Sequence, residues 1–361
     1  MGNTKATLLV TGISGNLGAR LLPLLADYQV IGVDLKPPAP VDNLRFVSLD
    51  LGLEESCREL FLLLKETQPV AVLHLAFVID PVRTGVLDLE QMWQINVAGT
   101  ARVMEAVTEA NRDSPVTTRF IFPSSVSAYG SDLPQPVNED YPLGAHTLPY
   151  ALHKMESDKV VQQRAPALRG CSVYLLRPHI FAGASVENYL VGAFRGTPNG
   201  RSSRAARMRS EGKRLPCMLP YGSRYLENKI QFVHVDDMAR LLAYIVRRTE
   251  PEAQRLTILN VAGRGQSPTF AQCIEMAGAK LVRVPGKWAF RLVLQYLWKS
   301  GTSAIPPEAL PYMTGEYTMN TDRLQRFLGA EYEEVIRYTI ADAFRDTFAA
   351  TPPLQQSAAV R

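Results

Sequence analysis

The chain has 361 residues, 46% of them hydrophobic, which is enough for one large domain or two medium ones with a substantial core. Its 39 basic and 35 acidic residues leave a net charge of +4, a bias too weak to indicate a nucleic-acid-binding protein. Four scattered cysteines without a CxxC pair give no sign of a disulfide framework, and the first residues lack a signal-peptide pattern, so a cytoplasmic location is expected.

Short apolar runs alternate with helical patterns throughout the first half of the chain. TLLVTG (7–12), VIGVD (30–34), AVLHLA (71–76) and RFIFPSS (119–125) are continuously apolar, as strands covered on both faces should be. A further helix begins near Tyr150 and leads to another such run, CSVYLLRP (171–178). The alternation predicts an α/β fold with a doubly wound parallel sheet of the Rossmann type.

The pattern changes after about residue 180. A passage rich in glycine, arginine and proline runs to about 228, then a strand and helix are expected over 230–248 and another strand over 257–263. We therefore expect a sheet domain over 1–180 plus 229–263, a smaller discontinuous substrate domain over 181–228 plus 264–350, and a flexible tail over 351–361.

One late segment, WAFRLVLQYLW (288–298), is strongly apolar. It is too short to span a bilayer and predicts a helix packed on a core. Lys287 and Lys299 at its flanks leave a membrane-surface role open as the alternative.

The stretch TGISGNLGAR (11–20) follows the first strand and contains Gly12, Gly15 and Gly18. A glycine-rich turn between a strand and a helix is the setting of a dinucleotide pyrophosphate site. The next strand ends in Asp34, where a carboxylate can accept both ribose hydroxyls and would repel a 2'-phosphate. NAD is therefore favoured over NADP, although Lys36 partly offsets that charge.

The motif YALHK places Tyr150 and Lys154 one helical turn apart, on the same helix face. An ammonium group beside a phenol stabilises the phenolate, which can take a proton from a substrate hydroxyl as hydride leaves. In the hydroxyl cluster PSSVSAYG (123–130), Ser125 can donate a hydrogen bond to the substrate oxygen. These groups suit an alcohol-to-carbonyl dehydrogenase, whereas an incidental YxxxK match on a surface helix is the alternative.

In combination, these motifs resemble the extended short-chain dehydrogenase/reductases, the NAD-dependent epimerase/dehydratase family. TGISGNLG, Asp34, LHLA, NVAGT, SSVSAYG, YALHK, LRPHIFAG and FVHVDD occur in the order of that family, over about residues 5 to 265. The resemblance implies an NAD-binding Rossmann domain, a homodimer, and catalysis by Ser125, Tyr150 and Lys154. It implies cofactor contacts at Gly12, Gly15, Asn16, Leu17, Gly18, Asp34, Asp50, Leu51, Leu75, Ala76, Asn96, Ser124, Pro178 and His179.

Several of these positions have a more specific expected role. Asp50 is placed to contact the adenine amine, with a solvated strand-end acid as the alternative. The resemblance implies that Asn96 holds the active-site helix or a water. It also implies that Pro178 and His179 border the nicotinamide.

The sequence departs from the family pattern in ways that narrow the chemistry. Sugar dehydratases of this family usually have an acid between the serine and the YG pair, but here residues 126–128 read VSA, which disfavours a dehydratase. Nucleotide-sugar enzymes often have an asparagine where Ile180 stands and an arginine near Ile230. Their absence weakens the nucleotide-sugar interpretation.

The segment 195–214, RGTPNGRSSRAARMRSEGKR, has seven basic residues and one acid. It is expected to be a mobile solvated loop, or alternatively a lid that supplies cations to an anionic substrate. It has no aromatic residue to stack on a base, which disfavours nucleic acid.

The histidines fall into two groups. His74 and His234 lie in apolar runs and are expected to be buried, whereas His146 and His153 are expected to be exposed. No pair of histidines has metal-ligand spacing, so no metal is predicted.

Three functions remain open, each with a small-molecule substrate and without nucleic acid or a membrane span. The first is an epimerase, possibly of a (nucleotide-)sugar, that oxidises a carbinol and reduces it from the opposite face. The second is a net dehydrogenase or reductase of a non-nucleotide, steroid-like or terpenoid alcohol or ketone. The third is a non-catalytic NAD-binding scaffold or sensor, which would need none of the three catalytic side chains.

Overall fold

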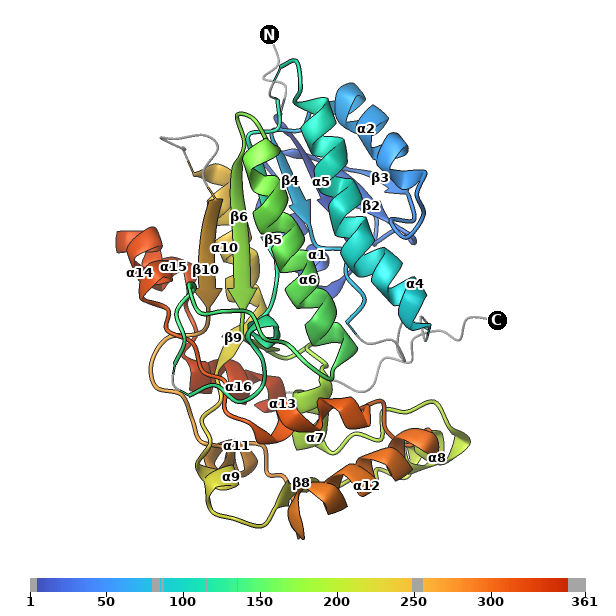
Figure 1. Cartoon of the computed structure of the whole chain (residues 1–361), viewed down its shortest axis with the longest axis vertical. Helices are drawn as coiled ribbons and strands as arrows, with labels where there is room; N and C mark the ends of the chain where they lie inside the picture. Colours follow the sequence, from blue (N-terminus) through green and yellow to red (C-terminus); the bar gives the residue numbers. More distant parts are fainter. Residues whose placement is uncertain are drawn as a thin grey trace.

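The structure is a computed structural model that describes residues 5–79, 85, 88–114, 116–134, 136–248 and 256–349. Its centre is a seven-stranded sheet whose neighbouring strands are all parallel, in the order β10-β6-β5-β4-β1-β2-β3 (Figure 1). The strands are β1 (Thr7–Thr11), β2 (Gln29–Asp34), β3 (Leu44–Ser48), β4 (Ala71–His74), β5 (Arg119–Pro123), β6 (Ser172–Pro178) and β10 (Leu256–Val261). The predicted doubly wound α/β fold is confirmed.

Alternate side chains of the strands enter two separate apolar cores. In β1, Leu8 and Val10 belong to one core and Leu9 to the other, and all three are fully buried. Such strands have no polar face, which is why the sequence reads as continuous apolar runs. One face is covered by α2 (Ser56–Thr67), α5 (Gly99–Ala110) and α6 (Pro149–Arg164), the other by α1 (Asn16–Leu21) and α10 (Val235–Arg247) (Figure 1).

The strand order reverses beside β1. The chain proceeds outward from β1 to β3 and then crosses to the other side of β1 to form β4. Ligands of open α/β sheets bind beyond the carboxyl ends of the strands at such a point, because the two adjoining loops diverge there. The glycine-rich turn follows β1 directly, so the topology places it at this crevice.

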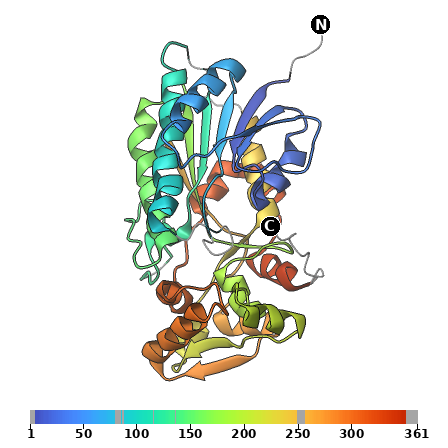
Figure 2. The same ribbon diagram turned by 90° about the vertical axis from the view of Figure 1, so that its right-hand side faces the viewer.

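A smaller part of the chain lies below the carboxyl end of the sheet (Figure 2). It contains two short parallel pairs, β7 (Ile180–Ala182) with β9 (Phe232–His234) and β8 (Cys217–Pro220) with β11 (Leu281–Val284). Besides α10, which covers the sheet, the helices between β7 and β11 are α7 (Tyr189–Arg195), α8 (Ser203–Ser210), α9 (Arg224–Glu227) and α11 (Phe270–Met276). Those that follow β11 are α12 (Gly286–Lys299), α13 (Leu310–Thr314), α14 (Asp322–Leu328), α15 (Tyr332–Val335) and α16 (Ile340–Ala349).

The expectation of a loop over 195–214 was wrong for Ser203–Ser210, which form α8. The mobility of the segment and its alternative role as a lid stay predictions. The side chain of Ser202 caps this helix by accepting a hydrogen bond from the backbone N–H of Ala205. The polar composition of the segment conceals so short a helix, since α8 buries only Ala205. The expected helix at 288–298 is confirmed as α12.

The domain limits stay a prediction, and the predicted tail at 351–361 lies outside the described residues. Among the residues that the structure describes, no helix is both long and apolar enough to cross a membrane.

Candidate active site

The predicted site residues converge at one edge of the sheet. Glycines of the first turn follow β1, Asp34 ends β2, Asp50 follows β3, and Leu75 follows β4. Ser124 and Ser125 follow β5, whereas Pro178 and His179 stand at the end of β6. Because all these strands are parallel, their carboxyl ends meet at the same edge, and residues distant in sequence become neighbours.

The three glycines of the turn have different structural roles. A Cβ on Gly12 would lie 2.5 Å from the backbone nitrogen of Ala76, and one on Gly18 would lie 2.3 Å from the carbonyl oxygen of Ile13. These two glycines therefore make room for the protein's own backbone. A Cβ on Gly15 would meet only the carbonyl oxygen of Gly12, at 3.2 Å, so Gly15 is the glycine whose open side can receive a ligand.

The carboxylate of Asp34 is held by backbone groups of the turn. One of its oxygens accepts a hydrogen bond from the N–H of Ser14 at 3.0 Å, and the other accepts one from the N–H of Leu35 at 2.7 Å. The side chain remains half-buried beside the glycine turn. Asp50 is also half-buried, and its carboxylate accepts a hydrogen bond from the N–H of Gly52 at 2.8 Å.

A chain of hydrogen bonds joins the first turn to the helix α5. The Thr11 hydroxyl lies 2.7 Å from His74 Nδ1, and His74 Nε2 lies 3.0 Å from the Thr100 hydroxyl. Burial, with a contribution from Lys154, lowers the pKa of His74 to about 3, so its ring is neutral. The Thr11 carbonyl accepts the N–H of Leu75 at 3.0 Å, which fixes the backbone that passes Gly12.

The two serines after β5 are both buried. Ser125 caps the short helix that follows, and its hydroxyl accepts hydrogen bonds from the backbone and the hydroxyl of Ser127 at 3.2 and 3.0 Å. The hydroxyl of Ser124 is buried without a hydrogen-bond partner. Because a buried polar group without a partner is costly, this hydroxyl marks a position suited to a ligand.

Tyr150 and Lys154 lie on α6 and share one aromatic neighbour, Phe77. The rings of Phe77 and Tyr150 meet edge to face with their centres 6.0 Å apart. The Lys154 ammonium lies 3.6 Å from the centre of the Phe77 ring and donates a hydrogen bond to the carbonyl of Pro123 at 2.7 Å. Sequence analysis missed Phe77, since nothing in the sequence distinguishes it from an ordinary core residue.

Burial shifts both titratable groups toward their neutral forms. It raises the pKa of Tyr150 to about 12, against a smaller effect of a hydrogen bond with Ser125. It lowers the pKa of Lys154 to about 7, against the opposing charge of Asp158. A general base therefore arises at Tyr150 only when additional positive charge stabilises its phenolate.

Asn96 connects the loop after β4 with α6. Its amide pairs with the backbone N–H and C=O of Val78 at 2.7 and 3.0 Å, and its nitrogen lies 3.3 Å from His153 Nδ1. The backbone carbonyl of Asn96 also accepts a hydrogen bond from the hydroxyl of Ser157 on α6 at 3.0 Å. Asn96 lies in a π-helical stretch, Gln94–Ala98, between α4 (Leu89–Trp93) and α5, and such stretches are frequent at functional sites.

The expectation that His153 is exposed was wrong, because only 7% of its surface is accessible. It packs against the Asn96 side chain, which a single-sequence pattern could not show. His146 is exposed and both His74 and His234 are buried, as expected.

A buried ion pair behind the site also escaped sequence analysis. Arg177 on β6 makes two hydrogen bonds of 2.9 Å to Asp158 on α6, and both side chains are almost fully buried. Arg177 also donates a hydrogen bond to the hydroxyl of Tyr129 at 2.7 Å, which joins the turn at Tyr129 and Gly130 to the same network. The spacing from Tyr150 through Lys154 to Asp158 on one helix face was the signal that could have revealed it.

His179, beyond Pro178, is held by the C-terminal part of the chain. Its Nε2 lies 2.8 Å from the carbonyl oxygen of Tyr317, and the two rings stack with centres 5.4 Å apart. Burial lowers the pKa of His179 to about 4, so the ring is neutral.

A family model of NAD-dependent epimerases and dehydratases matches residues 8–262, well over half of the chain. The chain belongs to the NAD-dependent epimerase/dehydratase family. Members of this family are NAD-dependent enzymes, and its cofactor, NAD, is also the cofactor here. The sequence prediction of family and cofactor is confirmed.

Several proteins similar to this chain are named for a sugar nucleotide or have been solved with one bound. The UDP-glucose 4-epimerase of Drosophila melanogaster is 26% identical over 256 residues, which cover 64% of this chain and 70% of that protein. The structure of MoeE5 in complex with UDP-glucuronic acid and NAD is 20% identical, with a TM-score of 0.62 over 95% of this chain and 97% of that one. A Bacillus anthracis dTDP-glucose 4,6-dehydratase in complex with NAD is 16% identical, with a TM-score of 0.63 over 95% and 96%. At these identities the solved structures show a common fold.

The residues at the sheet edge fit NAD. Gly15 is exposed directly before α1, and the Asp34 carboxylate stands at the end of the next strand. The partnerless Ser124 hydroxyl lies at the end of β5 on the same edge. In the described ranges, no group of three or more His, Cys, Asp and Glu side chains could hold a metal ion.

Proposed function

We propose that this protein is an NAD-dependent epimerase of a sugar, with UDP-glucose 4-epimerase chemistry as its reference reaction. One observation carries the proposal: Ser125 follows β5, Tyr150 and Lys154 lie on α6, and a hydrogen bond joins Ser125 to Tyr150 at the sheet edge where we place NAD. A protein that only bound NAD would need none of these three side chains. The named relatives act on nucleotide sugars, which supports the same substrate class here.

In the proposed site, Gly15 and the first residues of α1 would receive the pyrophosphate and Asp34 the ribose hydroxyls. The carboxylate would repel the 2'-phosphate of NADP. NAD, when bound, supplies a hydride acceptor and a positive charge. That charge and the Lys154 ammonium would oppose the effect of burial and lower the pKa of Tyr150 from about 12.

The substrate reaction is a reversible oxidation at one carbinol. Tyr150 would take the proton of the substrate hydroxyl as the carbinol is oxidised to a ketone, an oxidation for which bound NAD would be the hydride acceptor. Ser125 donates a hydrogen bond to the oxygen throughout. Reduction of the ketone from its opposite face would then need the same proton back from Tyr150, which would give the inverted alcohol and restore the base.

A second function, net oxidation or reduction of an apolar alcohol or ketone, is favoured by Ile180 and Ile230. Ile230 is buried in the apolar core of the C-terminal part and Ile180 packs against it. Neither side chain can hold a diphosphate through hydrogen bonds.

The test is to incubate the purified protein with UDP-galactose and to measure both UDP-glucose and free NADH. Epimerase chemistry gives UDP-glucose without accumulation of NADH. Accumulation of NADH with an apolar alcohol, and no conversion of UDP-galactose, would favour the second function. If neither occurs with any substrate while NAD is bound, the scaffold hypothesis replaces both.

A further inference from the structure

Helix α12 turns one face into the protein and leaves the other uncovered. Phe290 and Leu294 are buried, whereas 67% of Trp288, 56% of Leu292 and 57% of Tyr296 is exposed. The spacing of four residues places the three exposed side chains on one stripe. Large apolar side chains gathered on one surface mark a contact site, whereas single exposed ones are ordinary.

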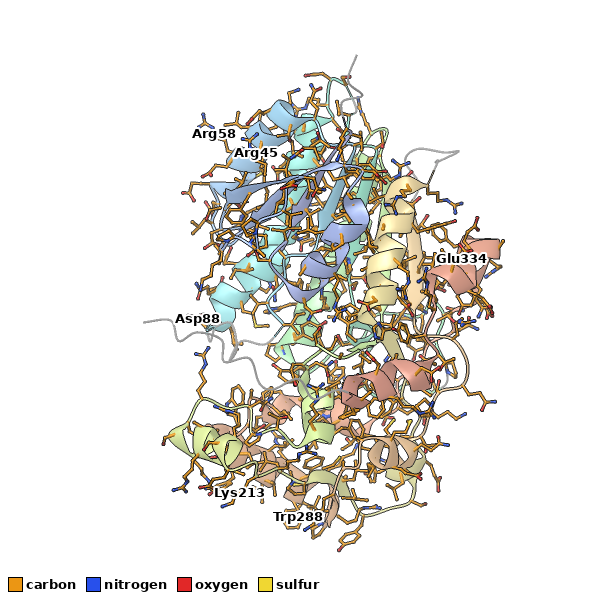
Figure 3. The ribbon with its side chains drawn as sticks, turned by 180° about the vertical axis from the view of Figure 1, so that it is seen from behind. Arg45, Arg58, Asp88, Lys213, Trp288 and Glu334 are labelled. Atoms are coloured by element: carbon orange, nitrogen blue, oxygen red, sulfur yellow. The ribbon has the colours of Figure 1, made fainter. Side chains whose placement is uncertain are left out.

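Positive charges accompany this stripe. Lys287, Arg291 and Lys299 are exposed on the same helix, and α12 contains no acidic residue. Trp288 lies at the end of the molecule opposite to Arg45 and Arg58 of the sheet (Figure 3).

The basic segment 195–214 adjoins this helix. Arg204 on α8 donates a hydrogen bond to the Tyr296 hydroxyl at 2.8 Å, and its guanidinium lies 5.9 Å from the centre of the Tyr296 ring. The segment and α12 together have nine more basic than acidic residues, whereas the whole chain has an excess of four. Their one acid, Glu211, is paired with Lys213 at 2.8 Å. The charge of the chain is therefore concentrated at this end, with apolar side chains among the cations.

We propose that this end of the molecule, formed by α8 and the exposed face of α12, docks on an anionic lipid surface. Lysine and arginine side chains bind the headgroups, and Trp288 and Leu292 enter the boundary between headgroups and acyl chains. A nucleic acid would pair with the cations but leave the Leu292 stripe in water. A second copy of the chain would bring two strongly cationic surfaces together.

Docking in this way brings the active site close to the bilayer. The buried face of α12, with Phe290 and Leu294, belongs to an apolar cluster against which Tyr150 packs. One apolar cluster thus separates the docked helix from the proposed catalytic tyrosine. The docking proposal itself does not depend on which substrate Tyr150 acts on.

The test is co-sedimentation of the full chain with vesicles of phosphatidylcholine alone and with one-third phosphatidylserine. The wild type is expected to bind the anionic vesicles, and this binding should weaken as the salt concentration is raised. It should not bind the neutral vesicles. The double variant Trp288→Ser, Leu292→Ser should bind at least tenfold more weakly. Replacement of Arg291 and Lys299 by Gln should weaken binding at least fivefold.

The matched control is Leu62→Ser with Arg58→Gln, since Leu62 is 54% exposed on the sheet domain and Arg58 is exposed beside it. This control should bind anionic vesicles as the wild type does. The proposal is overturned if the wild type does not bind these vesicles, binds neutral ones equally, or loses binding in the control. It is also overturned if the α12 variants change the oligomeric state without lipid, because the stripe then covers a second copy. If the protein binds duplex DNA and not the vesicles, the surface formed by α8 and α12 is assigned to nucleic acid.

Discussion

The charged form of Lys154 is destabilising in the cofactor-free fold, and this cost depends on pH in a calculable way. Burial lowers its pKa from 10.5 to about 7, so the folded state binds fewer protons than the unfolded state between these values. The cost is fully present below about pH 7 and is relieved as pH rises toward 10.5. Lys154 is therefore expected to lower the stability of the fold, and we attribute its presence to its role in the proposed reaction.

The variant Lys154→Met isolates this effect, because methionine has a similar length and no charge. From pH 7 to pH 9 the wild type should gain about 2 kcal/mol in free energy of unfolding relative to the variant, since each unit of proton linkage is worth about 1.4 kcal/mol. Urea unfolding of the cofactor-free proteins, followed by circular dichroism at both pH values, measures the difference. Lys159→Met, at a partly exposed position on the same helix, should show no such trend.

The reasoning would be refuted if the free energy of unfolding of the wild type, relative to that of Lys154→Met, stayed constant or fell from pH 7 to pH 9. It would mean that the ammonium is stabilised in the fold as well as it is in water. The contacts with the Pro123 carbonyl and the Phe77 ring would then outweigh burial.

Three further predictions concern single positions. Gly18→Ala should destabilise the fold by about 2 kcal/mol or more in urea unfolding, because its Cβ would overlap the Ile13 carbonyl, whereas Gly144→Ala should be near neutral. Asp158→Ala should cost about 3–5 kcal/mol by leaving Arg177 buried and unpaired, whereas the exposed Glu66→Ala should have a much smaller effect. Asp34→Ala should raise the Kd for NAD about tenfold or more and reduce the discrimination against NADP, as measured by calorimetric titration.

The sheet and its edge could be predicted from the sequence because local patterns determine them. Continuous apolar runs require strands covered on both faces, and a parallel sheet brings the ends of those strands together. The glycine turn, Asp34 and the YALHK motif can each be recognised from a short stretch of the sequence. That these residues lie close together follows from the parallel order of the strands, whose carboxyl ends meet at one edge of the sheet.

The remaining features depend on contacts that no single segment encodes. Phe77 contacts both Tyr150 and Lys154 only after the segment that follows β4 has packed against α6. His153 is buried because Asn96 lies against it, and α8 forms although its composition resembles a solvated loop. The sequence did not show either that Gly12 and Gly18 pack against the backbone of Ala76 and Ile13. Their contacts with the cofactor stay a prediction.

Several predictions remain to be tested by experiment, among them the homodimer, the substrate and the cytoplasmic location. That the residues VSA at 126–128 disfavour a dehydratase also stays a prediction.

The most direct measurement of the central claim compares NAD binding and turnover in Tyr150→Phe with those of the wild type and of Tyr221→Phe. The account predicts that Tyr150→Phe binds NAD with nearly the same Kd but loses hydride transfer, because only the proton acceptor is removed. Tyr221 is 64% exposed and far along the chain from the site, so its variant should retain both properties. Turnover that survives in Tyr150→Phe would contradict the account.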